Sequence, residues 1–400
     1  MVSVGIDIAK DKSTVCILRP YGEILKSPFD ILHDDAEVNT LIVELMKIGD
    51  EVRIVMEATG TYHLPLLQQL KAAGLFVSVI NPLAMKRYAS SAIRKAKTDK
   101  LDAIRIANYG IDYWYRLEEY QPPKIIYEEL RLLGRQYYQY NRMNTQCKIR
   151  LNNILDRVMP GIRPLFGASY AQVRGKDKLC DFISAYWHCD CITKLSEAKF
   201  VQSYNAWSKK KGYRANDEKA KTIYTLASSG IPTLPSNLAS TKMLVQEAVN
   251  TIQLMNSILF KILSQMQGLA KQLPEYSVVR GMSGVGEILA PCLIAEIGDI
   301  RRFNNNKSLV AYAGIDAPPF QSGTFNGTRR NISKRGSPIL RKAGFEAMQC
   351  LKRNKPTEDN AVYLYIIKKE AEGKPKKVAK IAGLNKFLRI YYARVSAIYA

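Results

Sequence analysis

Four carboxylates in this chain have the types and spacing that suit metal-dependent chemistry on a phosphodiester. Two stand in short apolar runs and two are three residues apart; they are Asp7, Glu57, Asp99 and Asp102. A carboxylate inside a hydrophobic strand is costly to bury unless its charge is compensated. A pair of divalent cations can compensate it, activate a nucleophile and stabilise the leaving oxygen of a phosphoryl transfer. We predict that the four residues bind two Mg²⁺ ions, which prefer oxygen ligands, and that Mn²⁺ can replace them.

The elements that would position these carboxylates form a mixed sheet with helices on its faces. Residues 2–29 contain three short apolar runs, and the fourth predicted strand ends at Glu57. Strands and helices alternate after it, an order typical of ribonuclease-H-like (RuvC-like) α/β domains. In that architecture the first and fourth strands are neighbours, so Asp7 and Glu57 converge. Asp99 and Asp102 share one helix face, because residues i and i+3 are adjacent. The other expected elements are helices at 36–47, 62–73, 83–90 and 98–109 and a strand at 75–80.

The charge balance indicates a polyanionic partner. The chain has 400 residues, with 59 Lys and Arg against 36 Asp and Glu, and a net charge of +23. Such an excess favours nucleic acid, since each neutralised phosphate releases counterions; general solubility or an acidic protein partner is the alternative. No apolar stretch reaches the ~18 residues that span a bilayer, and the N-terminus lacks the pattern of a signal peptide. We therefore expect a cytoplasmic, nucleoid-associated protein that does not bind membranes.

The cysteines leave one metal site open. Their number is seven, and this odd count, scattered over a long chain, suits reduced thiols. The only cluster consists of Cys180, His188, Cys189 and Cys191. Zinc could bind there, but Cys-x-Cys with an adjacent His is not a standard finger spacing. Buried or surface thiols are the favoured interpretation.

Long amphipathic helices are predicted after Pro122-Pro123, where the first domain ends. Residues 128–155 form one such helix, and a second has apolar positions spaced by threes and fours, close to a heptad repeat. This pattern predicts an antiparallel hairpin or an intermolecular coiled coil. Its seam positions are Val245, Val249, Ile252, Met255, Leu259, Ile262, Met266 and Leu269. The insert at about 160–235 has an irregular pattern. The predicted domains are 1–121, a helical region at 122–272, and a mainly α-helical part at 273–400.

A glycine-rich turn near the start of the last domain is a candidate phosphate site. Gly284 and Gly286 would expose backbone N–H groups at a helix N-terminus, where a DNA or RNA phosphate can bind. A simple turn between two helices is the alternative. Two basic clusters are also better explained by phosphate contact than by a solvated surface. They are Arg94, Lys95, Lys97 and Lys100, and Arg329, Arg330, Lys334 and Arg335.

Motifs at both ends of the chain together resemble the DEDD transposases of bacterial insertion sequences, a family that includes the Piv-type DNA invertases. The N-terminal motifs are Gly5-Ile-Asp-Ile-Ala-Lys10, Met56-Glu-Ala-Thr-Gly-Thr-Tyr62, Val79-Ile-Asn-Pro82 and Lys97-Thr-Asp-Lys-Leu-Asp-Ala103. The C-terminal ones are Gly284-Val-Gly286, Glu296-Ile-Gly-Asp299, Arg302-Phe303, Ala311-Tyr-Ala-Gly314 and Ile332-Ser-Lys-Arg-Gly336. They occur in the expected order, and the insert is unmatched. Ser283 stands where relatives commonly carry Pro.

The resemblance implies a RuvC-like domain followed by a C-terminal transposase domain with a nucleophilic serine. That serine falls on Ser322, in Phe320-Gln-Ser-Gly323; without the resemblance, Ser-Gly in a loop would be read as a turn. Attack by its hydroxyl on a phosphodiester leaves a phosphoserine link, which conserves bond energy for strand exchange. The resemblance also implies guidance by a structured bridge RNA that pairs with donor and target DNA.

Three functions remain open at this point. The first is an RNA-guided, Mg²⁺-dependent serine recombinase that excises and inserts its own element. It requires two DNA partners to be cut together, so we expect a homo-oligomer, a dimer or a tetramer. The second is a junction-resolving nuclease that uses the carboxylates with water and forms no covalent link. The third is a nucleic-acid-binding scaffold without catalysis.

Overall fold

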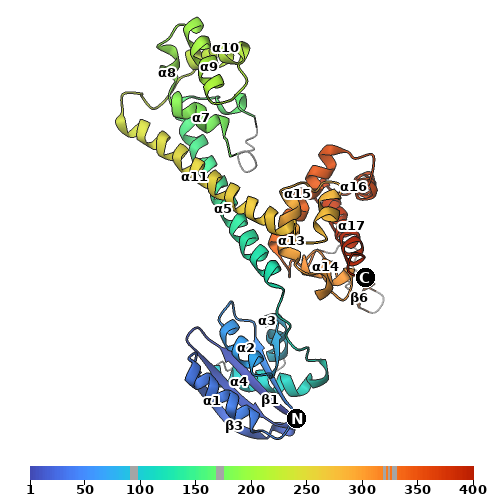
Figure 1. Ribbon diagram of the computed structural model, residues 1–400. Helices are drawn as coiled ribbons and strands as arrows, with labels where there is room; N and C mark the ends of the chain where they lie inside the picture. The colour runs from blue at the N-terminus through green and yellow to red at the C-terminus, as the bar shows by residue number, and fades with distance from the viewer. Residues whose placement is uncertain (91–97, 168–174, 319–320, 323–324, 327–330) are drawn as a thin grey trace. The chain divides into compact units, whose positions relative to one another are not determined.

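The computed structural model describes residues 1–90, 98–167, 175–318, 321–322, 325–326 and 331–400 (Figure 1). The chain forms two compact units, Met1–Pro122 and Pro123–Ala400. The further division of the second unit at residue 272 stays a prediction. Within the described ranges, no helix is long and apolar enough to cross a membrane.

A five-stranded mixed sheet in the order β3-β2-β1-β4-β5 forms the centre of the first unit. β1 pairs antiparallel with β2 and parallel with β4, while β3 and β5 are the edge strands. The strands are β1 Val2–Ile8, β2 Lys12–Leu18, β3 Ile24–Leu32, β4 Val52–Glu57 and β5 Phe76–Ile80. β-Branched residues dominate β1 and β4, as is usual for buried strands. The predicted ribonuclease-H-like strand order is confirmed.

Helices pack on both faces of this sheet. Helices α1 (Asp35–Met46) and α2 (His63–Ala72) bury leucines against one face, where the main core of the unit lies. Helix α4 (Asp99–Asp112) covers the other face with small side chains, and α3 (Pro82–Ala89) packs beside α4. Thr98 starts α4 by accepting a hydrogen bond from the backbone N–H of Leu101, at 3.2 Å.

The second unit is built on an antiparallel hairpin of two long helices, α5 (Ile125–Val158) and α11 (Ala239–Ala270) (Figure 1). The hairpin is one of the two arrangements predicted. From Val245 onward the buried positions of α11 keep a continuous four–three spacing: Val245, Val249, Ile252, Asn256, Leu259, Leu263, Met266 and Ala270. Three predicted seam residues, Met255, Ile262 and Leu269, are therefore only partly buried. The seam contains Asn256 in place of the predicted Met255. Oδ1 of Asn256 accepts a hydrogen bond from Nδ2 of Asn144 at 2.8 Å.

Each end of the hairpin carries a helical cluster with its own core. At one end are α7 (Lys178–Ala185), α8 (Cys189–Thr193), α9 (Glu197–Lys210) and α10 (Asp217–Ser229), packed around aromatic residues such as Phe182 and Tyr204. The insert that looked irregular in sequence is therefore largely helical; its helices are too short to give a long periodic pattern. At the other end are α12 (Tyr276–Gly281), α13 (Leu289–Ile297), α14 (Asn306–Tyr312), α15 (Pro338–Asn354), α16 (Ala361–Ala371) and α17 (Lys376–Ser396).

Candidate active site

A row of polar side chains crosses four strands of the sheet at one level. Asp7 in β1 is opposite Thr14 in β2, and Thr14 is opposite Asp30 in β3. In the parallel pair β1–β4, Ile6 is opposite Met56, so Asp7 and Glu57 follow at the next position of each strand. Residues at one level of neighbouring strands point to the same face of a sheet. The fold thus brings Asp7 and Glu57 onto one face, both partly buried.

Helix α4 lies directly on this face. A Cβ built on Gly5 would be 2.3 Å from the backbone N of Ala107, and one built on Gly110 would be 2.1 Å from Oγ of Ser3. Glycine is therefore required at both places, because α4 and β1 approach each other too closely for a side chain. Ser3, Gly5 and Asp7 alternate onto the same face of β1. The polar row accordingly lies on the side of the sheet that α4 covers.

The first turn of α4 brings the other two carboxylates to the level of this row. Two residues of β1 span roughly 6.6 Å, a distance that four to five helical residues cover at about 1.5 Å each. The helix passes Ser3 at residue 110 and Gly5 at residues 103–107. A further step of four to five residues toward the N-terminus of α4 corresponds to Asp7 on β1, and it reaches Asp99 and Asp102. Asp102 is partly buried, and Asp99 is exposed.

Three residues beside the carboxylates were missed by the sequence analysis. Nζ of Lys12 donates to Asp30 Oδ2 at 2.6 Å, and Oγ1 of Thr14 donates to Asp30 Oδ1 at 2.7 Å. The hydrogen bond to Asp30 is the main reason that the pKa of Lys12 is raised, and the charge of Asp99 adds to it. The same bond is the main reason that the pKa of Asp30 is lowered. Only the strand register, which sequence patterns do not reveal, brings these residues to the site.

The donor set suits a divalent metal, although its members are not gathered tightly around one point. Carboxylate oxygens at one level of a sheet are ligands that Mg²⁺ prefers. Yet in the described part of the chain no three His, Cys, Asp or Glu side chains are grouped closely enough to hold a metal ion. Asp102 instead pairs with Nη1 of Arg105 at 2.7 Å. Carboxylates repel one another, so a bound cation would be needed to draw the four predicted ligands together.

Ser322 lies in a two-stranded hairpin of the second unit. Strand β6 (Gln321–Ser322) pairs antiparallel with β7 (Phe325–Asn326), and Ser322 is opposite Phe325. Three of the basic residues predicted to contact phosphate, Lys100, Lys334 and Arg335, are exposed. The remaining ones lie outside the described residues: Arg94, Lys95, Lys97, Arg329 and Arg330.

The glycine-rich turn joins α12 to α13. Gly284 has a φ of +86°, and a Cβ there would be 2.6 Å from the carbonyl oxygen of Ala347 in α15. Packing against α15 is thus sufficient reason for this glycine. A Cβ on Gly286 would meet open space. Binding of a phosphate at the turn stays a prediction.

The cysteine cluster in the insert has the geometry of buried thiols. Both ring nitrogens of His188 are engaged, Nε2 with the carbonyl oxygen of Leu234 at 2.9 Å and Nδ1 with the backbone N–H of Asp190 at 3.0 Å. Burial raises the pKa of Cys189 to about 11 and also raises that of Cys180. All four members of the cluster are described, and no three of them group as metal ligands. The interpretation as thiols is therefore favoured over zinc.

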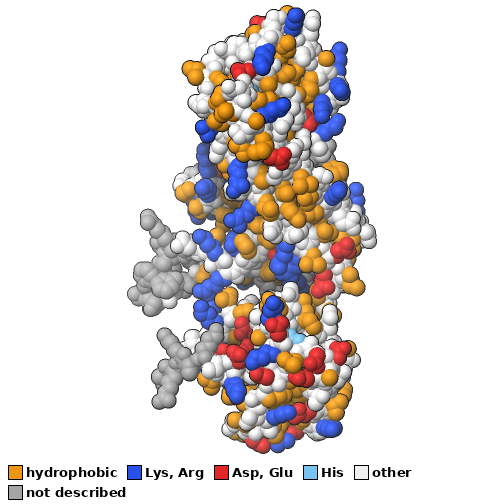
Figure 2. All heavy atoms as spheres, turned by 90° about the vertical axis from the view of Figure 1, so that its left-hand side faces the viewer, with side chains coloured by type: hydrophobic (Ala, Val, Ile, Leu, Met, Phe, Trp, Pro, Cys, Tyr) orange, Lys and Arg blue, Asp and Glu red, His pale blue; other side chains and the backbone are white. Residues whose placement is uncertain are grey.

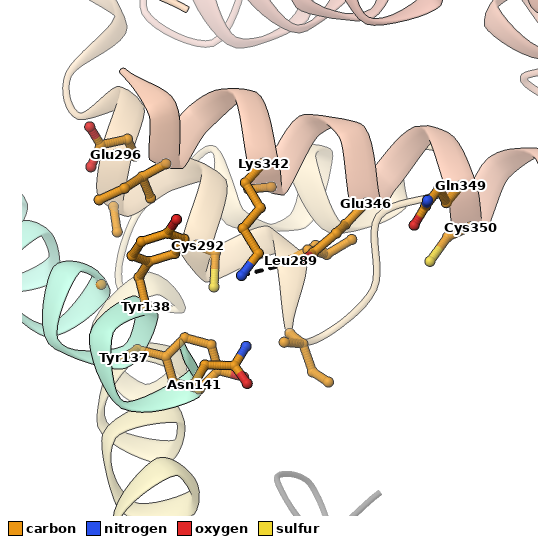
Figure 3. A pocket seen from close by; sticks show the side chains of 15 residues that line it. Tyr137, Tyr138, Asn141, Leu289, Cys292, Glu296, Lys342, Glu346, Gln349 and Cys350 are labelled. Atoms are coloured by element: carbon orange, nitrogen blue, oxygen red, sulfur yellow. Dashed lines mark ion pairs between the residues drawn. The ribbon is translucent and has the colours of Figure 1, made fainter. Parts of the chain in front are cut away.

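A cavity of about 320 Å³ lies between α5, α13 and α15 (Figure 3). Its walls are mostly apolar, with Tyr137 from α5 and Cys292 from α13. Nζ of Lys342 lies 3.9 Å from Oε1 of Glu346 and 4.6 Å from the ring centre of Tyr138. Burial raises the pKa of Cys292 to about 12 and raises the pKa of Glu346. None of the candidate catalytic or nucleic-acid-binding residues lines this cavity, but Glu296, the first residue of a C-terminal motif, does.

Comparisons with known proteins cover both ends of the chain. The family model of the DEDD IS110 transposases matches residues 4–160. The model described as "Transposase IS116/IS110/IS902 family" matches residues 276–363.

Individual relatives match over different spans. An uncharacterized 44.8 kDa protein of insertion element IS116 from Streptomyces clavuligerus is 23% identical over 370 residues, which are 92% of this chain and 88% of that protein. The pilin gene-inverting protein of Moraxella bovis is 32% identical over 108 residues, which are 27% of this chain and 33% of that protein. A solved structure of T. thermophilus RuvC in complex with a Holliday junction substrate matches 29% of this chain and 96% of that one, with 14% identity and a TM-score of 0.23.

Proposed function

The chain belongs to the IS110/IS116 family of DEDD transposases, which is related to the pilin gene-inverting proteins, and we propose that it is a serine recombinase guided by a structured RNA. Membership implies transposase function and DNA binding, and the RuvC-like, DEDD-type first unit implies a divalent metal. The proposal adds the covalent intermediate at Ser322, the identity of the metal as Mg²⁺ and the RNA. In this reading the protein excises and inserts its own insertion sequence.

The observation that supports this reaction most directly is the register that brings Asp7 and Glu57 to one level, to which we infer that Asp99 and Asp102 also belong. Asp7 and Glu57 occupy neighbouring strands in register, and the first turn of α4 reaches the same level. These residues would hold the metal, which when bound would activate the attacking oxygen and stabilise the leaving one. Lys12 extends the row with a donor for a phosphate oxygen, because its ammonium keeps two N–H groups besides the one that it donates to Asp30.

Ser322 would carry out the exchange as a transesterification. Its Oγ attacks the scissile phosphorus and loses its proton, while the bond from phosphorus to the leaving strand oxygen breaks and that oxygen takes up a proton. A hydroxyl of the incoming strand then attacks the phosphoserine and releases the serine. Each step exchanges one phosphate ester for another, so no external energy source is needed. Carboxylates and serine belong to different units, and a homo-oligomer can combine units from different copies.

Trapping on suicide DNA tests this mechanism. The complete chain, purified with RNA transcribed from its flanking non-coding DNA, is incubated with Mg²⁺ and a nicked donor substrate, and the products are resolved on a denaturing gel. We expect a protein–DNA adduct that Ser322→Ala abolishes. The control Ser264→Ala, at an exposed position of α11, keeps the adduct. Cleavage that survives Ser322→Ala unchanged would instead identify a junction nuclease that uses water.

Two further measurements separate the remaining alternatives. A scaffold without catalysis predicts that Asp7→Ala and Glu57→Ala leave plasmid recombination intact, whereas the proposed reaction requires both carboxylates. Sequencing of the RNA that co-purifies with the protein tests the guide. Recombination by protein freed of RNA would refute that part of the proposal and leave the serine chemistry standing.

A further inference from the structure

The loop that contains Ser322 is closed at its base by a dense set of hydrogen bonds. Asp316 precedes the segment that contains Ser322, and Ser333 follows it. The backbone N–H of Ser333 donates to the carbonyl of Asp316 at 2.8 Å, and its hydroxyl donates to the Asp316 carboxylate. The backbone N–H of Lys334 donates to the carbonyl of Gly314 at 2.9 Å. We call residues 312–316 and 333–337 the loop base.

Two glycines make this closure possible. Gly314 has a φ of +64°, and a Cβ on it would be 2.8 Å from the backbone N of Gly336. A Cβ on Gly336 would be 2.2 Å from the carbonyl oxygen of Tyr312. Nη1 of Arg341 in α15 joins the two segments from one side, with bonds to the carbonyls of Ala313 at 3.0 Å and Gly336 at 3.1 Å.

Glu296 joins the same two segments from the other side. This residue of α13 is 4% exposed, and Figure 3 shows it near the N-terminal end of α15. Its Oε1 accepts a hydrogen bond from Oγ of Ser337 at 2.7 Å. The hydroxyl of Tyr312 lies 3.3 Å from the same atom and 3.1 Å from the backbone carbonyl oxygen of Glu296. A buried carboxylate is costly without such partners. Glu296 therefore depends on both segments of the loop base, and both depend on it.

Positive charge around Glu296 fixes the arrangement further. Nε of Arg135 lies 3.8 Å from Oε2 of Glu296, and Nη2 of Arg131 donates to the hydroxyl of Tyr312 at 3.3 Å. The guanidinium of Arg302 lies 4.5 Å from the ring centre of Tyr312. The loop base is thus connected to α5, α13 and α15, the rigid helices of this part of the unit. Catalytic groups need such support, because small displacements from the reactive geometry reduce rates strongly.

We propose that Glu296 is a positioning residue of the Ser322 site: its carboxylate holds the two segments of the loop base together and so fixes the approach of Ser322 to the scissile phosphate. This inference rests on the proposed role of Ser322. Glu296 touches neither DNA nor metal in this role and acts only through Ser337 and Tyr312. Its contribution is therefore to the rate of the covalent step and not to DNA affinity.

Single-turnover adduct formation at saturating suicide DNA tests this role. We expect Glu296→Ala to slow the appearance of the Ser322–DNA adduct by roughly 10- to 100-fold, the effect of a displacement of about 1 Å. The dissociation constant for the same DNA, measured without Mg²⁺, should change by less than about twofold. Glu296→Gln keeps the side-chain volume and an oxygen that accepts from Ser337, so it should restore most of the rate. The matched control is Glu372→Ala, since Glu372 pairs with Lys369 at an exposed helix end.

Tyr312→Phe provides a second variant in case Glu296→Ala fails to fold. It removes the hydroxyl that contacts Glu296 and Arg131 but keeps the packed ring, and we expect an intermediate loss of rate with only a small fall in melting temperature. A Glu296→Ala adduct rate equal to that of the unmodified protein would overturn the inference, as would a loss of rate matched by an equal loss of DNA affinity. If the unmodified protein forms no adduct that requires Ser322, the proposed function itself falls, an outcome visible before any Glu296 variant is compared.

Discussion

Substitution of Gly5 tests the close contact that places α4 on the carboxylate row. In Gly5→Ala the new Cβ would stand 2.3 Å from the backbone of Ala103 and of Ala107. Optimal contact between such atoms requires about 3.5 Å, so the helix must move by about 1 Å. Overpacking typically costs 1–3 kcal/mol. We expect the upper end, about 3 kcal/mol, because the atoms that clash belong to the backbone and cannot rotate away.

The expected loss translates into a measurable shift in melting. Unfolding entropy is about 2.1 cal/mol/K per residue, which for the unit Met1–Pro122 makes 3 kcal/mol equivalent to about 12 °C. Hydrogen exchange of β1 and α4 peptides in the full chain, monitored by mass spectrometry as temperature rises, follows this unit specifically. Gly49→Ala is the control, because a Cβ there meets open space in the same unit. Equal stability of the two variants would refute the close contact, and with it the inferred level of Asp99 and Asp102.

Three other predictions concern packing, pH and charge. Asn256→Ala should cost about 1–3 kcal/mol in urea unfolding, because the buried amide of Asn144 loses its partner; replacement of both by Leu should recover the loss, and failure to do so would contradict the paired geometry. Glu346→Gln should raise the melting temperature at pH 8 but not at pH 4: burial raises the pKa of Glu346, so the native state favours its protonated form and loses stability as pH rises. A pH-independent difference would refute this. Lys12→Gln should reduce the salt dependence of DNA binding by about one counterion, whereas Lys71→Gln, in α2 on the opposite face of the sheet, should not; equal slopes would remove Lys12 from the interface.

The local parts of the fold could be predicted from sequence, whereas the non-local parts could not. The runs that form β1 and β4 and the helix that begins near Asp99 are visible as hydrophobic patterns with a cap, so their positions agree closely with the structure. The predicted seam of α11 contained Met255 where the structure has Asn256, because a pattern based on apolar residues selects the methionine over its polar neighbour. Membership of Asp30 in the polar row depends on the register of β2 and β3. No periodicity encodes that register.

The residues of the candidate site also differ in how far the sequence alone could predict them. Asp7 and Glu57 could be expected to converge, since the order of strands determines which ones are neighbours. Ser322 emerged only through a family resemblance, because nothing in the residue types around it marks a nucleophile. The role inferred for Glu296 depends on three separate segments that meet in space. Their motifs were visible in the sequence, but the hydrogen bonds that join them were not.

The α5–α11 hairpin also sets a fixed length within the second unit. Its shorter helix has 32 residues, which at about 1.5 Å per residue makes a rod of roughly 48 Å. The aromatic cluster of the insert and the cluster that contains the serine hairpin lie at opposite ends of this rod (Figure 1). Figure 2 shows Lys and Arg side chains interspersed with hydrophobic and acidic ones on the face that it draws. On B-form DNA, 48 Å equals about 14 base pairs at 3.4 Å each. Because the seam repeats every seven residues, deletion of one repeat from both helices would shorten this rod by about 10 Å and preserve the packing of its ends.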